Sequence, residues 1–174
     1  MSTMEAPLIY LKGKSAHVMA MGTLKPIGSA IKVAKKLKEE YGAQLIHIVD
    51  FDALNGNRVN YDVYDHLTFL MHIEVEVRPE PAMIKPLLDI NARVVIPLPT
   101  KLDLSQFAEQ KRLLVGKMSP RYKGPVDGVF DIYLDGESEE TVKELMKKGK
   151  RVLVNAEQNK GAKGVFARIA EPQL

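Results

Sequence analysis

Residues 44–60 read QLIHIVDFDALNGNRVN, an apolar run of strand length that ends in two acids and then in an Asn/Gly loop. Strands of a parallel sheet are buried on both faces and therefore read as nearly continuous apolar runs. Charged residues then appear where such a strand leaves the core, at its carboxyl end. Proteins that alternate strands and helices bind ligands at that end. The segment therefore predicts an α/β protein with a functional rim near Asp50 and Asp52.

Strand-like and helix-like segments alternate along the rest of the chain. Apolar runs predict strands, and apolar residues at helical spacing predict helices. The predicted strands cover residues 8–11, 45–49, 71–77, 93–96, 113–115, 128–134, 151–154 and 164–167. The predicted helices cover residues 27–41, 60–70, 79–89, 102–109 and 139–148.

This alternation predicts right-handed βαβ units in one domain over residues 1–174. The number of strands favours a compact, closed (β/α)8 barrel of the TIM-barrel type, although the chain is shorter than most such barrels. The connections after the fifth and seventh strands are too short for an ordinary helix. The alternative is an open, doubly wound parallel sheet.

Residues 17–22 are apolar for a loop, and we expect them to pack under the barrel; a lid or an oligomer contact is the alternative.

Composition narrows the class of protein. The chain has a formal net charge of +3, interspersed acids and bases, and no Trp, so no nucleic-acid-binding stripe is expected. It has no Cys, which excludes disulfides and thiolate metal sites. No apolar run reaches the ~18 residues that span a membrane, and residues 1–7 lack the pattern of a signal peptide. We therefore expect a cytoplasmic protein, and the Lys/Glu-rich helices are compatible with a thermophilic source.

The third predicted strand alternates strictly between faces. His72, Glu74 and Glu76 share one face, and three apolar residues share the other. In a barrel the outer face lies under helices and must be apolar, so the polar face points inward, where unpaired carboxylates are costly. Three interpretations stay open for these residues. They form an active site, a structural salt-bridge network, or the wet face of an edge strand.

Further polar residues are predicted near strand ends, where they would form a largely acidic mouth. They are Tyr10, Asp50, Asp52, Lys117, Asp131, Asp135, Asn155, Glu157 and Arg168. Lys117, if close to Glu74 or Glu76, would be an ion-pair partner or a group for carbonyl chemistry. His47 and His72 are interpreted as hydrogen-bonded core residues. No spacing motif supports a metal site and none is predicted, although Mg²⁺ at Asp50, Asp52 and Glu76 stays an open alternative.

Several stretches carry a resemblance to a known family. They are PLIYLKG (7–13), QLIHIVDFDA (44–53) with Asn60, Arg78, ARVVI (92–96), Asp135-Gly136 and KGVFAR (163–168). In this order they resemble the histidine-biosynthesis branch of the ribulose-phosphate-binding barrels, which includes the phosphoribosyl-formimino isomerase and the cyclase subunit of imidazole glycerol phosphate synthase. The resemblance implies a closed barrel that acts on a phosphorylated, sugar-like compound.

The chain departs from that family where the family does its chemistry. The family has catalytic Asp residues after its first and fifth strands, where this chain has Tyr10 and Lys117. Residues 76–79 and 155–158 lack the glycines whose backbone N–H groups approach phosphate. The family reaction is therefore not transferred, and residual phosphate affinity would rest on Arg78, Lys163 or Arg168.

The preferred hypothesis is an isomerase- or lyase-like enzyme that acts on a small anionic, phosphorylated, sugar-like compound by acid/base proton transfer. Asp50 is the predicted base, Lys117 the electrophile, and Asp135 a second acid or substrate holder. The predicted substrate-binding residues are Asp52, Glu76, Arg78, Glu157 and Arg168. No cofactor, nucleic acid or membrane partner is predicted, and a homo-oligomer stays open. The competing hypothesis is a non-catalytic barrel relative that serves as a ligand-binding or assembly protein.

Overall fold

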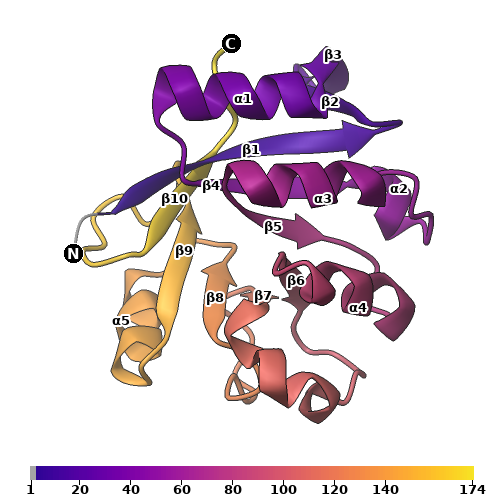
Figure 1. Ribbon diagram of the computed structural model, residues 1–174. Coiled ribbons are helices and arrows are strands. Elements are labelled where there is room, and N and C mark those ends of the chain that lie inside the picture. Colours follow the sequence, from indigo (N-terminus) through magenta and orange to yellow (C-terminus); the bar gives the residue numbers. More distant parts are fainter. Residues whose placement is uncertain (1–2) are drawn as a thin grey trace.

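Eight parallel strands form a closed barrel in the computed structural model, which describes residues 3–174 (Figure 1). In chain order they are β1 (Met4–Lys12), β4 (Leu45–Asp50), β5 (His72–Glu76), β6 (Arg93–Pro97), β7 (Leu114–Met118), β8 (Asp131–Leu134), β9 (Arg151–Asn155) and β10 (Ala167–Ala170). Strands β4 to β10 pair in sequence, and β10 pairs with β1, whose other edge pairs with β4. The predicted TIM-type barrel is confirmed, and the open sheet is wrong.

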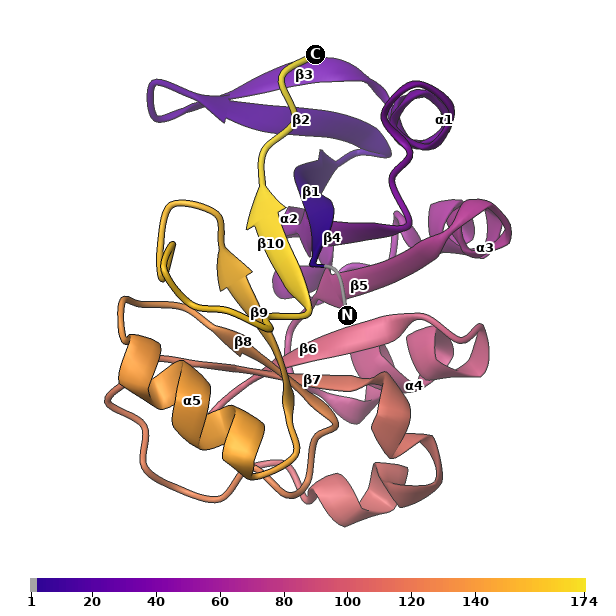
Figure 2. The same cartoon turned by 90° about the vertical axis from the view of Figure 1, so that its left-hand side faces the viewer.

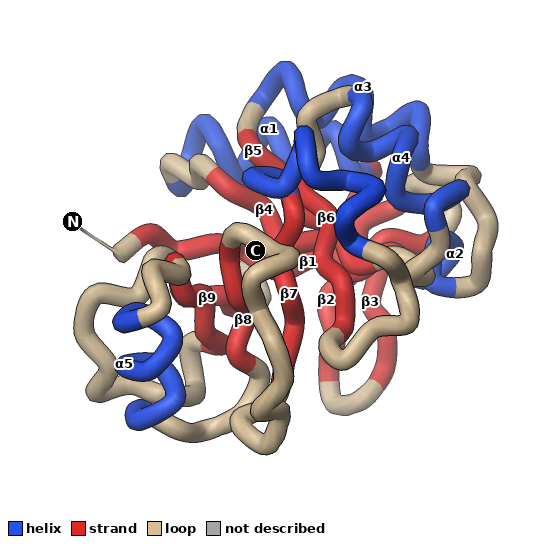
Figure 3. The backbone as a smooth tube through the Cα atoms, turned by 90° about the horizontal axis from the view of Figure 1, so that it is seen from below, coloured by secondary structure: helices blue, strands red, loops and turns tan. Residues whose placement is uncertain are grey.

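The helices cover the barrel unevenly. They are α1 (Ala30–Tyr41), α2 (Phe51–Leu54), α3 (Tyr61–Leu70), α4 (Pro81–Asp89), the 3-10 helix η1 (Leu104–Leu113) and α5 (Glu139–Lys147). Figure 3 shows α1, α3 and α4 together on one side of the strands and α5 on the other. Residues 119–130 after β7 and residues 156–166 after β9 contain no helix, as predicted for these two described connections.

A β-hairpin between β1 and α1 corrects the interpretation of residues 17–22. Strands β2 (Ser15–Ala20) and β3 (Thr23–Ser29) are antiparallel, and β2 pairs with the carboxyl half of β1 (Figure 2). The segment is therefore not packed under the barrel. Helix α1 begins at Ala30 rather than near residue 27 because β3 continues to Ser29, whose hydroxyl caps the helix at Lys32 N (3.3 Å).

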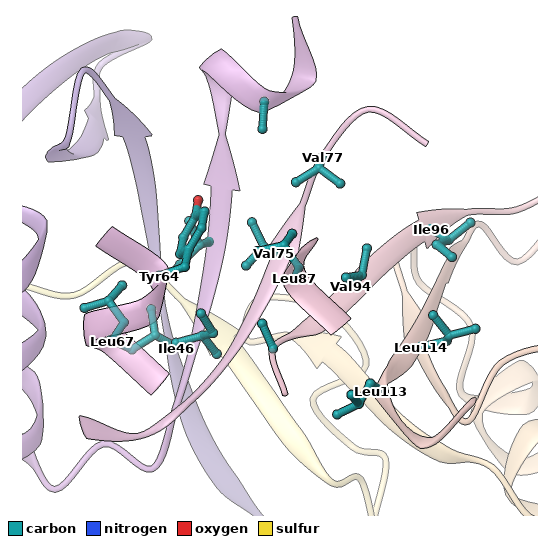
Figure 4. Close-up of a cluster of buried hydrophobic side chains, with 14 of the residues drawn as sticks. Ile46, Tyr64, Leu67, Val75, Val77, Leu87, Val94, Ile96, Leu113 and Leu114 are labelled. Carbon is teal, nitrogen blue, oxygen red and sulfur yellow. The ribbon is translucent and has the colours of Figure 1, made fainter. Parts of the chain in front are cut away.

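The larger apolar core lies between the barrel wall and the helices. Figure 4 shows Ile46 of β4 and Val75 of β5 among Tyr64 and Leu67 of α3 and Leu87 of α4. All five side chains are fully buried. Outward-facing strand residues are apolar because helices cover them, and this leaves the alternate residues of each strand to fill the barrel.

The barrel interior combines a small apolar cluster with charged groups. Its apolar residues are Ala6, Leu45, Val95, Val115, Tyr133, Leu153, Ala167 and Ile169. Between them lie buried His47, Glu74 and Asp131. The last strand is shifted from the predicted residues 164–167 to Ala167–Ala170 because Gly164 adopts a positive φ of 78° and forms a turn before it.

Candidate functional site

Four charged side chains from three strands form a continuous ionic chain inside the barrel. His47 of β4 lies between the two glutamates of β5, with its Nδ1 2.6 Å from Glu74 Oε2 and its Nε2 2.6 Å from Glu76 Oε2. The ammonium of Lys117 on β7 donates to Glu76 Oε1 at 2.9 Å. The predicted ion pair between Lys117 and a glutamate of the third strand is confirmed.

The chain connects the closed interior with the carboxyl-terminal mouth of the barrel. The side chain of Glu74 is inaccessible to solvent, that of Glu76 is 14% exposed, and that of Lys117 is 30% exposed. Glu76 is the last residue of β5, so the exposed end of the ionic chain lies at the carboxyl-terminal face, where barrel enzymes have their active sites. The inward orientation of Glu74 and Glu76 is confirmed, and the wet edge-strand interpretation is wrong.

The protonation states of this chain follow from its contacts. Burial alone would lower the pKa of His47, but the hydrogen bonds and charges of Glu74 and Glu76 outweigh it and raise the pKa to about 9. Burial raises the pKa of Glu76, and His47 and Lys117 together overcome that effect and lower it to about 2. The ring is therefore a cation, and Glu76 is an anion, across the neutral pH range.

Two tyrosines lie beside the exposed end. The ring of Tyr133 packs edge-on against His47 at 5.1 Å between centroids, and Lys117 Nζ lies 5.5 Å from the centre of the same ring. Burial raises the pKa of Tyr133, and the negative charges of Asp135 and Glu76 raise it further. Burial also raises the pKa of Tyr10, with added effects of Glu171 and Glu76. Both phenols therefore remain protonated donors at the mouth.

Asp50 lies in a separate network, away from the ionic chain. Its carboxylate accepts hydrogen bonds from Ala53 N (2.9 Å), Asn60 Nδ2 (2.9 Å) and the Tyr64 hydroxyl (2.7 Å). It is fully buried, and burial raises its pKa against the lowering effect of these three donors. The base role predicted for Asp50 gains no support from this placement, because its oxygens face α3 rather than the mouth.

Asp52 joins that network from the surface. Its Oδ2 accepts from Gly13 N at 2.8 Å and from Asn60 Nδ2 at 3.0 Å, while Asn60 Oδ1 accepts from Lys14 N at 2.7 Å. The contacts connect the loop after β4 with the root of the hairpin. Asp50 and Asp52 are thus close together, and their shared partner Asn60 joins the loop after β4 to the start of the hairpin.

The remaining predicted residues are dispersed around the rim and outer wall. Arg78 donates to Leu54 O at 3.2 Å, and Arg168 donates to Ala162 O at 2.9 Å on the outside of β10. Glu157 is exposed and pairs with Lys160 at 3.2 Å, and Asp135 is exposed just beyond β8. Of the predicted catalytic and substrate-binding residues, Lys117 and Glu76 are therefore the two that meet inside the barrel.

Asp131 is at the opposite end of the barrel from its predicted place. It is the first residue of β8 and accepts from Arg93 (3.0 Å) and from both Nε and a terminal nitrogen of Arg151 (2.8 Å each). The guanidinium of Arg151 stacks on the ring of Phe166, 3.9 Å from its centre. This cluster closes the amino-terminal end of the barrel and is structural.

His47 is the central residue of the ionic chain, and its sequence context predicted only a place in the core. The interpretation as a hydrogen-bonded core histidine is confirmed for His47, whereas His72 is exposed at the start of β5. Period-two alternation places His47 on the inward face of β4 with Leu45, and it pairs in register with Glu74. That inward parity, beside a strand with inward glutamates, was the available signal.

The described residues contain no group of three or more His, Asp or Glu side chains arranged to hold a metal ion. Over the same residues, no helix has the length and apolar character needed to cross a bilayer.

Comparisons with known proteins show the fold. No family model matches the sequence, and no curated protein matches it. A solved structure of dihydropteroate synthase from Thermus thermophilus, in complex with 6HMPPP, superposes with a TM-score of 0.60 at 13% identity, over 96% of this chain and 87% of that chain. At this identity the likeness concerns architecture alone. The protein is a TIM-type barrel, and the ionic chain inside it reaches solvent at the carboxyl-terminal mouth.

Proposed function

We propose that this protein is a barrel enzyme of the isomerase or lyase type. It acts on a small anionic carbonyl compound, of which phosphorylated sugars are the leading class, by proton transfer at the carboxyl-terminal mouth. This choice follows the sequence resemblance to the histidine-biosynthesis barrels. The observation that carries it is the pairing of Glu76 with Lys117 at the exposed end of a buried ionic chain.

The pair supplies both groups that enolate chemistry needs. Glu76 takes the proton from the carbon next to the carbonyl, and the electron pair of that C–H bond moves onto the carbonyl oxygen. The ammonium of Lys117 meets the developing negative charge. The proton then returns from Glu76 to carbon, so atoms and charge balance over the cycle.

Substrate binding also activates the base. In the free protein Lys117 and His47 hold the pKa of Glu76 near 2, which makes it a weak base. An anionic substrate that draws Lys117 away from Glu76 removes one of these two cations. The pKa of Glu76 then rises toward the range in which a carboxylate accepts a proton from carbon.

Hydrogen exchange in D₂O tests the proposal directly. The protein is incubated with ribulose 5-phosphate, ribose 5-phosphate or glyceraldehyde 3-phosphate, and the loss of the proton next to the carbonyl is followed by NMR. We expect exchange above the buffer rate, reduced about a hundredfold or more in Glu76→Gln and Lys117→Met. Lys36→Met on the exposed face of α1 is the matched control and should exchange like the wild type.

A non-catalytic, ligand-binding role is the second candidate. It is favoured by the mutual pairing of the charges at the mouth and by Tyr10 and Lys117 in the places of the family's catalytic acids. Thermal-shift measurements with the same three compounds separate the two roles. Stabilisation without proton exchange would support the binding role and overturn the enzymatic one.

A further inference from the structure

Glu74 is buried at the closed end of the ionic chain, where it touches no solvent. Its Oε2 lies 2.6 Å from His47 Nδ1, while its Oε1 is the one buried side-chain oxygen or nitrogen among the described residues without a hydrogen-bond partner. A buried carboxylate oxygen without a donor is costly, and such groups in native proteins call for an explanation beyond packing. The side chain of Glu74 therefore has a single hydrogen-bond partner, His47.

The geometry around His47 fixes the state of the ring. Ionised carboxylates only accept hydrogen bonds, and both ring nitrogens lie 2.6 Å from carboxylate oxygens. Both nitrogens must then donate, which requires the doubly protonated ring. A ring with one acceptor instead of two has no such requirement, because a neutral imidazole satisfies it.

We propose that Glu74 is a positioning residue that acts through His47: it fixes the ring as a doubly protonated donor and thereby keeps Glu76 an anion at the mouth. The direction follows from burial, since Glu74 is inaccessible and Glu76 is partly exposed. Glu74 is too deeply buried to contact a ligand, but it determines whether the His47 ring is doubly protonated and can donate to Glu76. The proposal deepens the function proposed for this mouth, but the positioning itself needs no substrate.

The surroundings of the ring contain few other charges. Glu74 and Glu76 come from β5, Lys117 from β7, and the neutral Tyr133 from β8. Arg93 of β6 lies below, where it is paired with Asp131 of β8, and it also feels the charge of Glu74. Removing the charge of Glu74 therefore leaves Glu76 as the only carboxylate bonded to His47.

A Gln in place of Glu74 tests the role without emptying space. The amide has the volume of the carboxyl, and it can accept from a protonated Nδ1 or donate its own N–H to an unprotonated one. Packing is therefore conserved and a singly protonated ring can be satisfied, while the charge is lost. The readout is the ¹⁵N NMR signal of His47 across a pH titration, which distinguishes doubly from singly protonated rings. Asp50→Asn is the matched control, because Asp50 is equally buried on the same strand as His47 but bonds to Ala53, Asn60 and Tyr64 instead.

We expect the His47 titration midpoint to fall by about one to three pH units in Glu74→Gln and to stay in place in Asp50→Asn. The carboxyl ¹³C signal of Glu76 should titrate at higher pH in Glu74→Gln than in the wild type. An unchanged His47 midpoint in Glu74→Gln, or an equal fall in Asp50→Asn, would overturn the proposal.

The wild type provides a second test that does not depend on the variants folding. A singly protonated His47 ring at neutral pH in the wild type would overturn the positioning role. Because NMR needs no substrate, a protein without proton exchange but with the expected His47 titrations would refute the enzymatic function and leave the positioning role intact.

Discussion

The buried histidine between two glutamates should make the protein lose stability as the solution becomes alkaline. The pKa of His47 is raised from 6.5 to about 9 in the folded protein. A raised pKa means that the folded state binds the proton more tightly than the unfolded state. The resulting stabilisation is complete below pH 6.5 and is lost as the pH rises through 9.

The magnitude follows from the size of that shift. Each pH unit of pKa difference corresponds to about 1.4 kcal/mol, so His47 stabilises the fold by about 3 kcal/mol below pH 6.5. His47 has no solvent exposure, so no screening by water reduces this value. Such an amount is a large fraction of the free energy of unfolding of an ordinary domain.

Urea denaturation at a series of pH values measures the effect. The free energy of unfolding should fall between pH 6.5 and 9 in the wild type, and this window ends before tyrosines of the unfolded chain ionise near pH ~10. In His47→Gln the fall should disappear. His72→Gln, which changes an exposed histidine of β5, should retain it.

A flat profile over this window in the wild type would refute the reasoning. It would mean that the ring is neutral in the folded protein and that the two short contacts do not both carry a proton. A fall of equal size in His47→Gln would refute it as well, because the slope would then come from another group.

Three substitutions test, by denaturation, the contacts that stabilise the barrel away from the ionic chain. Tyr64→Phe removes the hydroxyl that donates to buried Asp50 at 2.7 Å and should cost about 1 to 3 kcal/mol, with an unchanged α/β circular dichroism spectrum. Gly116→Ala would place a Cβ 2.7 Å from a methyl group of Leu98 and should lower the free energy of unfolding by about 1 to 3 kcal/mol. An unchanged value would show that the side chain of Leu98 moves aside at no cost. Asp131→Asn leaves Arg93 and Arg151 without their shared carboxylate and should lower the free energy of unfolding by about 3 kcal/mol. An unchanged free energy of unfolding would show that this cluster does not stabilise the amino-terminal end of the barrel.

The barrel was predictable because its signals are local. Apolar runs such as residues 45–49 mark strands buried on both faces, and Gly42 or Gly149 mark helix ends; in the structure both glycines follow helices at positive φ. The short connections after the fifth and seventh strands were also a matter of counting residues. The hairpin of β2 and β3 escaped prediction because β2 is mostly half-buried and β3 is mostly exposed, so neither strand reads as a buried apolar run.

The candidate site was predictable in part. Alternation along β5 placed Glu74 and Glu76 on one face, which points inward if the sheet is a closed barrel, and the same period applied to β4 places His47 on that side. Asp50 was misplaced because it follows Val49 at the point where β4 turns into α2, and its carboxylate caps that helix. The side chain of Asp50 therefore faces the helices outside the barrel rather than the mouth.

The sequence by itself predicted most of the barrel strands and helices, favoured the closed barrel over the open sheet, and separated the two faces of the strand at residues 71–77, because these depend on spacing within one segment. Tertiary structure alone decided which inward residues meet. Strands in a closed barrel are tilted and staggered, so the height of a side chain depends on the register of every strand around the ring. That stagger sets Lys117 of β7 beside Glu76 of β5, two strands away, and sets Asp131 at the opposite end of the barrel.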